Sequence, residues 1–315
     1  MKRQRAEGLP HSIQARLKAK AEAEGRPFAE LLDLYGLERF LHRLATSSHG
    51  DRFVLKGALL IRHWLGTDTR PTRDVDLMGP AELGPEVVRQ VLTDVLESRV
   101  ADDGLEFDLS TLRTEQIRDS SPLPGYRARF EGYLGQMVIH YQVDMVPAAF
   151  LYPPETRIQM AGILDFPMAE IKAYTPYSVV AEKLEAMVAL GDANSRMKDY
   201  YDLAALARGM RYDGEVFAEA IRVCFRERST GIPADQPVGI REEFAADPAN
   251  SRLWGAFLRK ARLPDTYSDL SKVLAILRAF LLPPAQAART NASFRQEWPP
   301  GGPWRDAGAR SGGQQ

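Results

Sequence analysis

One segment constrains the fold most, because its pattern changes from strand to helix and back to strand over a short stretch of chain. The apolar run at residues 53–55 predicts a buried strand, Gly57 permits a tight turn, and residues 58–65 form an apolar run that predicts a helix. A polar loop at 67–73 leads into residues 74–77, where acidic and apolar side chains alternate with the period of a strand. The segment therefore predicts two strands joined through a tight turn and a helix.

The second strand of this segment carries two carboxylates on one face. Asp74 and Asp76 are two residues apart, so their Cα atoms lie about 7 Å apart on a strand. Like charges this close repel each other, and a divalent cation removes the repulsion. Carboxylates suit Mg²⁺ or Mn²⁺, and Mg²⁺ also binds substrate phosphates. With Val75 and Leu77 facing a core, the strand is typical of metal-dependent phosphoryl or nucleotidyl transfer, although any half-exposed strand alternates similarly.

A third carboxylate is available on a later strand. Residues 137–146 alternate, which places two sets of side chains on opposite faces: Ile139, Tyr141, Val143 and Met145 on one, and His140, Gln142 and Asp144 on the other. If this strand lies beside the first acidic strand, Asp144 can complete a metal cluster or act as a general base on an attacking hydroxyl. The alternative is a solvent-facing Asp near a strand end.

Binding of a nucleotide phosphate has two candidate regions. Lys56, Gly57 and Ala58 stand at a helix start, where free N–H groups can bind a triphosphate. The helix predicted over 177–190 has an apolar arc that includes Lys183, while Glu182 and Glu185 fall outside it. A lysine in this position is costly unless its ammonium reaches an anion or water, so we expect it to bind a phosphate. A structural salt bridge is the alternative.

Three further basic residues are candidate nucleotide contacts. Arg73 directly precedes the acidic strand. Arg196 and Lys198 open the helix predicted over 195–207, where acidic side chains are the usual partners of the helix dipole. Basic residues at a helix start therefore favour a role in facing a ligand.

Five ordered blocks of the chain resemble the AbiEii family of nucleotidyltransferase toxins, the enzymatic halves of abortive-infection, type IV toxin–antitoxin pairs. The blocks are ERFL at 38–41, FVLKGA at 53–58, RPTRDVDL at 70–77, AEK at 181–183 and KDYYDL at 198–203. The resemblance extends from about residue 10 to about residue 285. It implies an enzyme of the polymerase-β-like superfamily that uses a nucleoside triphosphate and Mg²⁺, in some members extending the 3′ end of tRNA.

The resemblance also implies roles for particular residues. The family's metal-binding pair would fall on Asp74 and Asp76, and its motif lysine on Lys183. Its later acidic position would fall on Asp199, which we expect to orient Lys183 or to lie near the nucleotide. Where the wider superfamily often has Gly-Ser, this chain has Gly57-Ala58, so backbone N–H groups would carry the phosphate contacts. A cognate antitoxin, usually a winged-helix transcription regulator, is implied as a partner.

Composition narrows the setting. The 315 residues are 44% apolar and 26% charged, and 41 basic against 42 acidic residues give a net charge of −1. No overall basic field favours nucleic acid, so any RNA contact must be local. Candidate arginines are Arg70 with Arg73, Arg127 with Arg129, and Arg222, Arg226 and Arg228. A lone cysteine excludes an internal disulfide. We expect no membrane span and no signal peptide, and therefore a cytoplasmic protein.

The fold expected is α+β: a nucleotidyltransferase-like mixed sheet with a helical N-terminal segment and a mostly helical C-terminal half, and the active site in a cleft between sheet and helices. The expected domains are a helical segment at 1–50, a catalytic core with the metal site at 51–175, a helical domain at 176–284 and a disordered tail at 285–315. The tail is expected because Pro283 and Pro284 should stop regular structure and the chain from about residue 285 is rich in Gly, Pro, Arg and Gln. Other elements are expected as helices at 86–99, 215–227, 240–246, 251–260 and 270–281, and as strands at 105–113 and 126–133.

The predicted activity is nucleotidyl transfer, and two alternatives remain open at this point. A metal-dependent hydrolase of nucleotides or RNA would use the same acidic cluster with water as the acceptor. A non-catalytic protein that acts only by binding a partner would not need the acidic pair.

Overall fold

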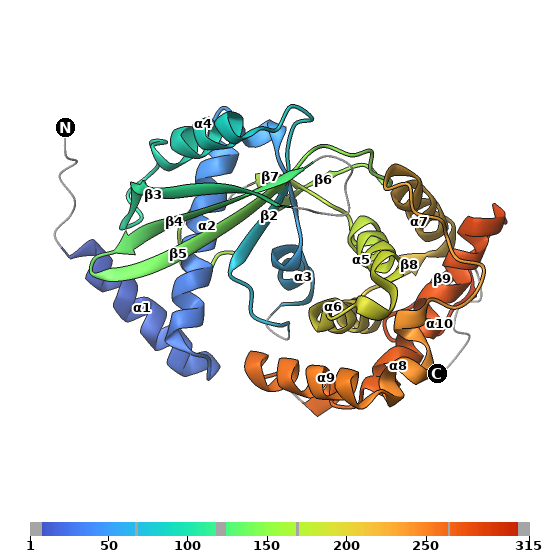
Figure 1. Ribbon diagram of the computed structural model, residues 1–315. Coiled ribbons are helices and arrows are strands. Elements are labelled where there is room, and N and C mark those ends of the chain that lie inside the picture. Colours follow the sequence, from blue (N-terminus) through green and yellow to red (C-terminus); the bar gives the residue numbers. More distant parts are fainter. Residues whose placement is uncertain (1–7, 67–68, 118–123, 168–169, 264, 308–315) are drawn as a thin grey trace, which may run out of the picture. The chain divides into compact units, whose positions relative to one another are not determined.

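The computed structural model describes residues 8–66, 69–117, 124–167, 170–263 and 265–307, and divides into two compact units (Figure 1). Unit 1 comprises Met1–His63, Pro71–Ala149 and Thr156–Ala173. Unit 2 comprises Trp64–Arg70, Phe150–Glu155 and Tyr174–Gln315.

Unit 1 contains a seven-stranded mixed sheet and its helices. In chain order the elements are α1 (Leu9–Glu24), α2 (Phe28–Thr46), the short 3₁₀ turn η1 (Gly50–Arg52), β1 (Val54–Lys56), α3 (Ala58–Leu65, whose last two residues belong to unit 2), β2 (Asp74–Met78), α4 (Pro85–Leu96), β3 (Leu105–Ile117), β4 (Gly125–Leu134), β5 (Met137–Val146), β6 (Thr156–Gln159) and β7 (Glu170–Ala173). The strand order is β3-β4-β5-β2-β1-β7-β6. The β2–β5 and β1–β7 pairs are parallel and the other neighbours antiparallel.

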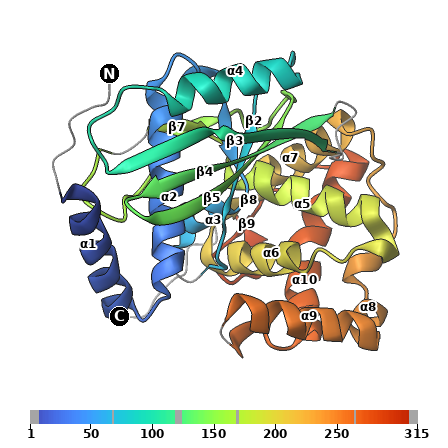
Figure 2. The same ribbon diagram turned by 60° about the vertical axis from the view of Figure 1, so that its left-hand side comes forward.

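The core of unit 1 follows the predicted alternation. The side chains expected to point inward are almost completely buried: Val75, Leu77, Ile139, Tyr141, Val143 and Met145. Helix α2 crosses one face of the sheet, where it contacts β5 and β7 (Figures 1 and 2). On the inner face the ring of Tyr141 stacks on Phe130 with 4.8 Å between ring centroids. The two acidic strands are therefore held rigidly from behind.

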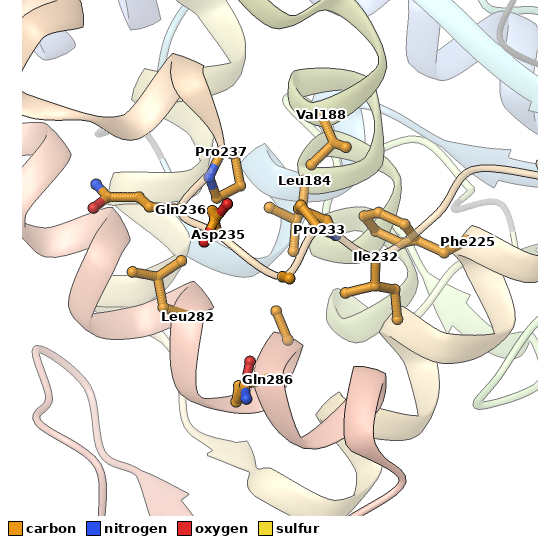
Figure 3. Close-up of a pocket in the computed structure, with 12 residues that line it drawn as sticks. Leu184, Val188, Phe225, Ile232, Pro233, Asp235, Gln236, Pro237, Leu282 and Gln286 are labelled. Atoms are coloured by element: carbon orange, nitrogen blue, oxygen red, sulfur yellow. The ribbon is translucent and has the colours of Figure 1, made fainter.

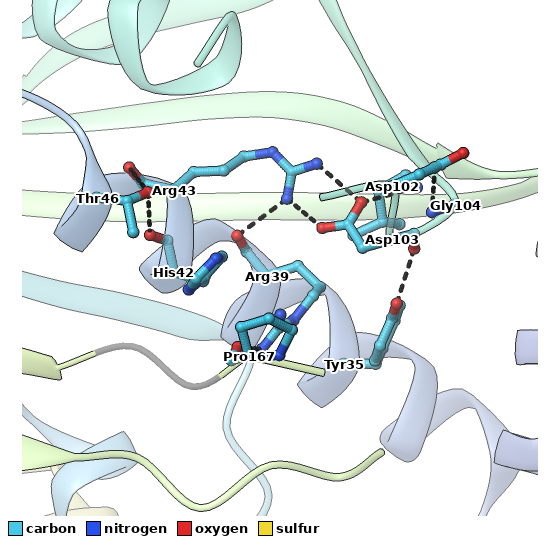
Figure 4. A network of polar contacts seen from close by, with 10 residues as sticks. Tyr35, Arg39, His42, Arg43, Thr46, Asp102, Asp103, Gly104 and Pro167 are labelled. Atoms are coloured by element: carbon cyan, nitrogen blue, oxygen red, sulfur yellow. Dashed lines mark hydrogen bonds and ion pairs between the residues drawn. The ribbon is translucent and has the colours of Figure 1, made fainter. Parts of the chain in front are cut away.

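A buried ion pair joins α2 to the start of β3. The Arg43 guanidinium donates to both carboxylate oxygens of Asp103, at 2.5 and 2.8 Å, and the Tyr35 hydroxyl donates to the Asp103 carbonyl oxygen at 2.7 Å (Figure 4). Arg43 and Asp103 are both buried. Because each charge has lost its water, the two stabilise the fold only as a pair.

Unit 2 is mostly helical. Its elements are α5 (Pro176–Leu190), η2 (Gly191–Ala193), α6 (Met197–Gly209), β8 (Tyr212–Asp213), α7 (Gly214–Glu227), η3 (Val238–Ile240), α8 (Glu242–Ala246), α9 (Pro248–Ala261), η4 (Asp265–Tyr267), α10 (Leu270–Thr290), β9 (Gln296–Trp298) and β10 (Arg305–Asp306). The three short strands form a small antiparallel sheet in the order β10-β9-β8. Helices α5 and α10 both pack against α7.

The expectation of a disordered tail from residue 285 is wrong for the residues described up to 307. Helix α10 continues through Pro283 and Pro284 to Thr290, and β9 and β10 follow it. Pro284 has no N–H to donate to the carbonyl of Phe280, four residues earlier. The indole N–H of Trp304 donates to that carbonyl instead, at 3.0 Å. Packing of Phe280 against Trp298, with 5.0 Å between ring centroids, holds this part of the chain on the helix.

The extended α10 also changes the membrane expectation. No membrane span was expected, yet by length and hydropathy alone α10 is apolar enough to cross a membrane. The run is longer than expected because the two prolines do not end the helix. However, 44% of the stretch is buried within the fold, and α10 packs on α6 and α7. A core helix of a soluble protein has the same pattern.

Replacing Asp103 by Ala would leave the Arg43 guanidinium buried without a counter-charge. We expect the free energy of unfolding to fall by about 3–5 kcal/mol, measured by chemical denaturation. The matched control is the double variant Arg43→Met with Asp103→Leu, which removes both charges and should lose clearly less stability than Asp103→Ala. Equal losses in the single and double variants would contradict the ion pair as the source of the effect.

Candidate active site

The predicted acidic strand is β2, and the predicted third carboxylate lies beside it. Asp74 and Asp76 are half-buried on one face of β2, and Val75 and Leu77 are fully buried on the other. Strands β2 and β5 pair in parallel, with Asp76 opposite Asp144. The expectation that these two strands are neighbours is confirmed, so the three carboxylates project from one face of the sheet.

The register of the sheet continues this polar face over five strands. Cross-strand partners project their side chains from the same face. Five partners in successive strands form what we call the charged row: Lys56, Asp76, Asp144, Arg127 and Glu115. Neighbouring strands lie about 4.8 Å apart, so the two acids at the middle of the row would repel each other if they stood alone. The row instead flanks this acidic pair with a cation on each side.

Gly57 is required by two features of the turn between β1 and α3. Its φ of 79° lies in the left-handed region that favours glycine. A Cβ at this position would also overlap the carboxylate oxygen Oδ2 of Asp76. The carboxylate of Asp76 therefore lies directly over the turn, and Lys56 on β1 is the cross-strand partner of Asp76. The structure thus brings the predicted phosphate-binding turn and the acidic pair together.

Asp144 forms an ion pair that the sequence does not reveal. Arg127 of β4 donates from Nε to Oδ1 of Asp144 at 2.7 Å and from Nη2 to Oδ2 at 2.6 Å. Hydrogen bonding to Asp144 raises the pKa of Arg127, and the charge of Asp74 adds to this effect. Arg127 was predicted only as a possible RNA contact. Its guanidinium instead contacts a candidate catalytic carboxylate.

The expected three-carboxylate metal cluster is not assembled in the part of the chain that the structure describes. Within those residues, no group of three or more His, Cys, Asp and Glu side chains could hold a metal ion. The carboxylate of Asp144 is bound by Arg127 instead. Asp74 and Asp76 remain as a pair of half-buried hard donors on one face. Such a pair fits Mg²⁺, which takes its other ligands from water and substrate phosphates. That they bind a metal stays a prediction.

A second polar group lies in unit 2 and centres on Lys183 of α5. The ammonium of Lys183 contacts Oδ1 of Asp199 at 2.5 Å and Oδ2 of Asp202 at 2.9 Å. Arg70 donates to the other side of Asp202, from Nε at 2.9 Å and from Nη2 at 3.0 Å. We call these four residues the lysine cluster. The cluster has two cations and two anions. Because each charge has a partner of opposite sign, the four can lie where they have little contact with water.

The charges of the lysine cluster fix its protonation states. Burial alone would lower the pKa of Lys183, but the carboxylates of Asp199 and Asp202 outweigh it and raise that pKa. Burial alone would raise the pKa of Asp202, but the positive charges of Lys183 and Arg70 outweigh this effect and lower that pKa. Lys183 therefore carries a full positive charge at neutral pH. Its place in an apolar helix face and its contact with Asp199 agree with the sequence prediction, while its function stays a prediction.

Sequence reasoning missed two members of the lysine cluster. Asp202 was given no role of its own from the sequence, and Arg70 was taken for a possible RNA contact. Asp202 is 2% exposed and lies one turn after Asp199 on α6. Two carboxylates at this spacing within an otherwise apolar, buried stretch are a signal for a buried cation, and this signal was available in the sequence.

The other charged residues singled out in the sequence differ in their exposure and in their partners. Arg196 and Lys198 are exposed at the start of α6. Arg73 forms an ion pair with Asp33 at 2.8 Å. Glu185 was expected outside the apolar face of α5 and is instead buried at 1% exposure. The reason is a pair of local partners, because Arg228 and Thr230 both donate to its carboxylate.

Unit 2 also contains a pocket of about 210 Å³ between α5, α7, α10 and the loop at 232–237 (Figure 3). Its lining is mostly apolar, and includes Leu184 and Val188 from the helix that carries Lys183. None of the predicted site residues lines it. The acidic pair and Asp144 belong to unit 1, and the lysine cluster belongs to unit 2. The expectation that both serve one cleft stays a prediction.

The chain was compared with known proteins. A family model described as the nucleotidyltransferase AbiEii toxin of type IV toxin–antitoxin systems matches residues 39–278. No curated protein matches the chain. Two Helicobacter pylori crystal structures are similar at 13% identity and 83% coverage of this chain: JHP933, with a TM-score of 0.46 and 92% of its own chain covered, and a protein provisionally described as a nucleotidyltransferase, with 0.47 and 95%.

The lysine cluster predicts a pH-dependent stability. The folded state lowers the pKa of Asp202, so its carboxylate stabilises the fold above its unfolded pKa, and this contribution is lost as the pH falls through the folded pKa. Asp202→Asn should therefore lower the free energy of unfolding by about 3–5 kcal/mol near neutral pH, with a smaller difference below about pH 4.

Denaturant unfolding of both proteins over this pH range measures the difference. Asp192→Asn, which changes an exposed carboxylate of the same unit, is the matched control and should show a small effect at every pH. A loss for Asp202→Asn that stays constant from neutral to acidic pH would refute the role given to its ionised form.

Proposed function

Because the family model spans most of its length, the chain belongs to the AbiEii family of nucleotidyltransferase toxins of type IV toxin–antitoxin systems, and we propose that it transfers a nucleotide from a nucleoside triphosphate to an acceptor hydroxyl in an Mg²⁺-dependent reaction. The proposed acceptor is the 3′ end of an RNA, such as a tRNA. In this reaction the acceptor hydroxyl loses its proton to solvent as its oxygen forms a bond to the α-phosphorus. The bond from this phosphorus to the oxygen that bridges to the β-phosphate breaks, and pyrophosphate leaves.

One observation carries the proposal: Asp74 and Asp76 lie on one sheet face, and the carboxylate of Asp76 stands directly beside the turn at Gly57. This arrangement offers carboxylates for a cation and backbone N–H groups for phosphates within a few residues of each other. Asp74 and Asp76 would hold Mg²⁺. When bound, the ion neutralises phosphate charge and polarises the phosphorus that is attacked.

The chain's own residues would do the rest. The N–H groups at Gly57 and Ala58 would bind the triphosphate, and Lys56 at the end of β1 would add a positive charge beside it. Asp144 would accept a hydrogen bond from the attacking hydroxyl and orient it. Most catalysis of phosphoryl transfer comes from such positioning and charge stabilisation.

Lys183 would act on the leaving group. Its ammonium is fully charged and would offset the negative charge that develops as pyrophosphate leaves. Asp199 would orient Lys183, to which it is bound at 2.5 Å. Arg73, Arg196 and Lys198 are further proposed contacts of the nucleotide. Arg196 and Lys198 are exposed side chains that can reach a ligand from solvent.

The family assignment implies an antitoxin partner. We propose that this partner is a winged-helix transcription regulator and that the pair works in the cytoplasm. With a net charge of −1, the chain has no global basic field, so contact with an RNA acceptor would rest on local arginines.

The test is transfer of label from each nucleoside triphosphate, labelled at the α-phosphate, into RNA in the presence of Mg²⁺ and total RNA. We expect label to enter a defined RNA. Asp74→Asn and Asp76→Asn should each lower the rate about a hundredfold or more, because each removes a charge that holds the cation. Asp165→Asn, which changes an exposed carboxylate of the same unit, should leave the rate unchanged.

The products separate the alternatives. Free nucleoside monophosphate as the sole product would indicate a hydrolase. Transfer that is equally fast in the wild type and in both acidic-pair variants would remove Asp74 and Asp76 from the reaction, provided that circular dichroism shows the variants to be folded.

A further inference from the structure

The feature that the proposed reaction does not use is the guanidinium of Arg127. It binds Asp144 through two parallel hydrogen bonds of 2.7 and 2.6 Å, the fork geometry that makes Arg a strong partner for a carboxylate. Arg127 and Asp144 are Cα partners in the antiparallel β4–β5 pair, so the contact follows from the register of the sheet. The side chain of Asp144 is 15% exposed. Water therefore screens this pair only partly.

The neighbouring side chains leave Asp144 as the carboxylate that Arg127 binds. Its own cross-strand partner on β3 is Glu115, yet Glu115 is bound by Arg129 at 2.6 Å. Arg129 also donates to the side chain of Gln142 at 3.3 Å. Of the two arginines of β4, Arg129 thus binds Glu115 and Gln142, and Arg127 binds Asp144.

The position of the Arg127 guanidinium decides what Asp144 can bind. Asp144 stands opposite Asp76, where a second divalent cation would find a carboxylate from each of two strands. The guanidinium contacts both oxygens of Asp144, so a cation on this carboxylate would lie against a positive charge. Repulsion at such short range in a partly buried site costs several kcal/mol.

We propose that Arg127 takes the place of a second divalent cation at Asp144, so that the acidic pair of β2 holds a single divalent ion with the nucleotide. Arg127 is then a positioning residue that fixes Asp144 for the acceptor and sets the number of metal ions. This inference rests on the proposed function, because it concerns the same site.

The test counts Mn²⁺ ions bound per chain by electron paramagnetic resonance, with a non-hydrolysable nucleoside triphosphate analogue present at saturation. The wild type should bind one protein-dependent ion. Arg127→Gln should bind a second ion, because Asp144 is freed, and the double variant Arg127→Gln with Asp144→Asn should return to one. Arg129→Gln, which changes the neighbouring arginine on the same strand, is the matched control and should keep the wild-type count.

A second variant guards against loss of folding in Arg127→Gln. Asp144→Asn in the wild-type background should leave the Mn²⁺ affinity within about twofold, whereas Asp76→Asn should weaken it about tenfold or more. A weakening of about tenfold in Asp144→Asn would make Asp144 a metal ligand and overturn the inference. Two ions in the wild type, or one ion in a folded Arg127→Gln variant, would also overturn it.

Failure of this inference can be told from failure of the proposed function. If Mn²⁺ binding with the analogue is the same in the wild type and in the double variant Asp74→Asn with Asp76→Asn, the acidic pair holds no ion and both proposals fail. If binding needs the acidic pair but the count does not respond to Arg127, the inference alone fails and the proposed function stands.

Discussion

The parallel register between β2 and β5 is the constraint on which the candidate site depends. It sets Asp76 directly beside Asp144, and a slip of one residue would turn every side chain of either strand to the other face. The register is fixed from behind, because the alternate residues of both strands are buried in the core of unit 1. Packing of apolar side chains thus determines where the carboxylates stand. The chemistry of the polar face is a consequence of the core beneath it.

The two polar groups of the chain follow the same electrostatic rule. In unit 1 the acids at the middle of the charged row are flanked by Lys56 and Arg127, and in unit 2 two carboxylates share Lys183 with a second cation on the far side. Charges with little access to water cost several kcal/mol each unless they are paired. Such pairing also keeps side chains in fixed positions, which suits a reaction that depends on placing charge against a developing negative charge. A hydrophobic pair of similar size would stabilise the fold equally well, but it could not place a charge against the negative charge that develops in the reaction.

The sequence predicted those features that depend on local pattern. Alternation predicted β5 with its correct ends, and the turn at Gly57 followed by α3 was also correct. The choice of ion-pair partners could not be predicted, since Arg127 meets Asp144 only through the pairing of two strands and Arg70 meets Asp202 across a long stretch of chain. The ordered C-terminal region escaped prediction for the same reason. A proline normally ends a helix because a carbonyl loses its donor, and only the folded chain shows that Trp304 replaces it.

The proposed reaction depends on a cation that the acids of β2 would hold jointly beside the phosphate-binding turn. The most direct measurement is the anomalous scattering of Mn²⁺ in crystals grown with a non-hydrolysable nucleoside triphosphate analogue. We expect a peak bound by the carboxylates of Asp74 and Asp76 and by phosphate oxygens of the analogue, close to Gly57. A nucleotide bound with its metal elsewhere, and neither of these carboxylates in contact with that metal, would show that the acidic pair does not hold the ion.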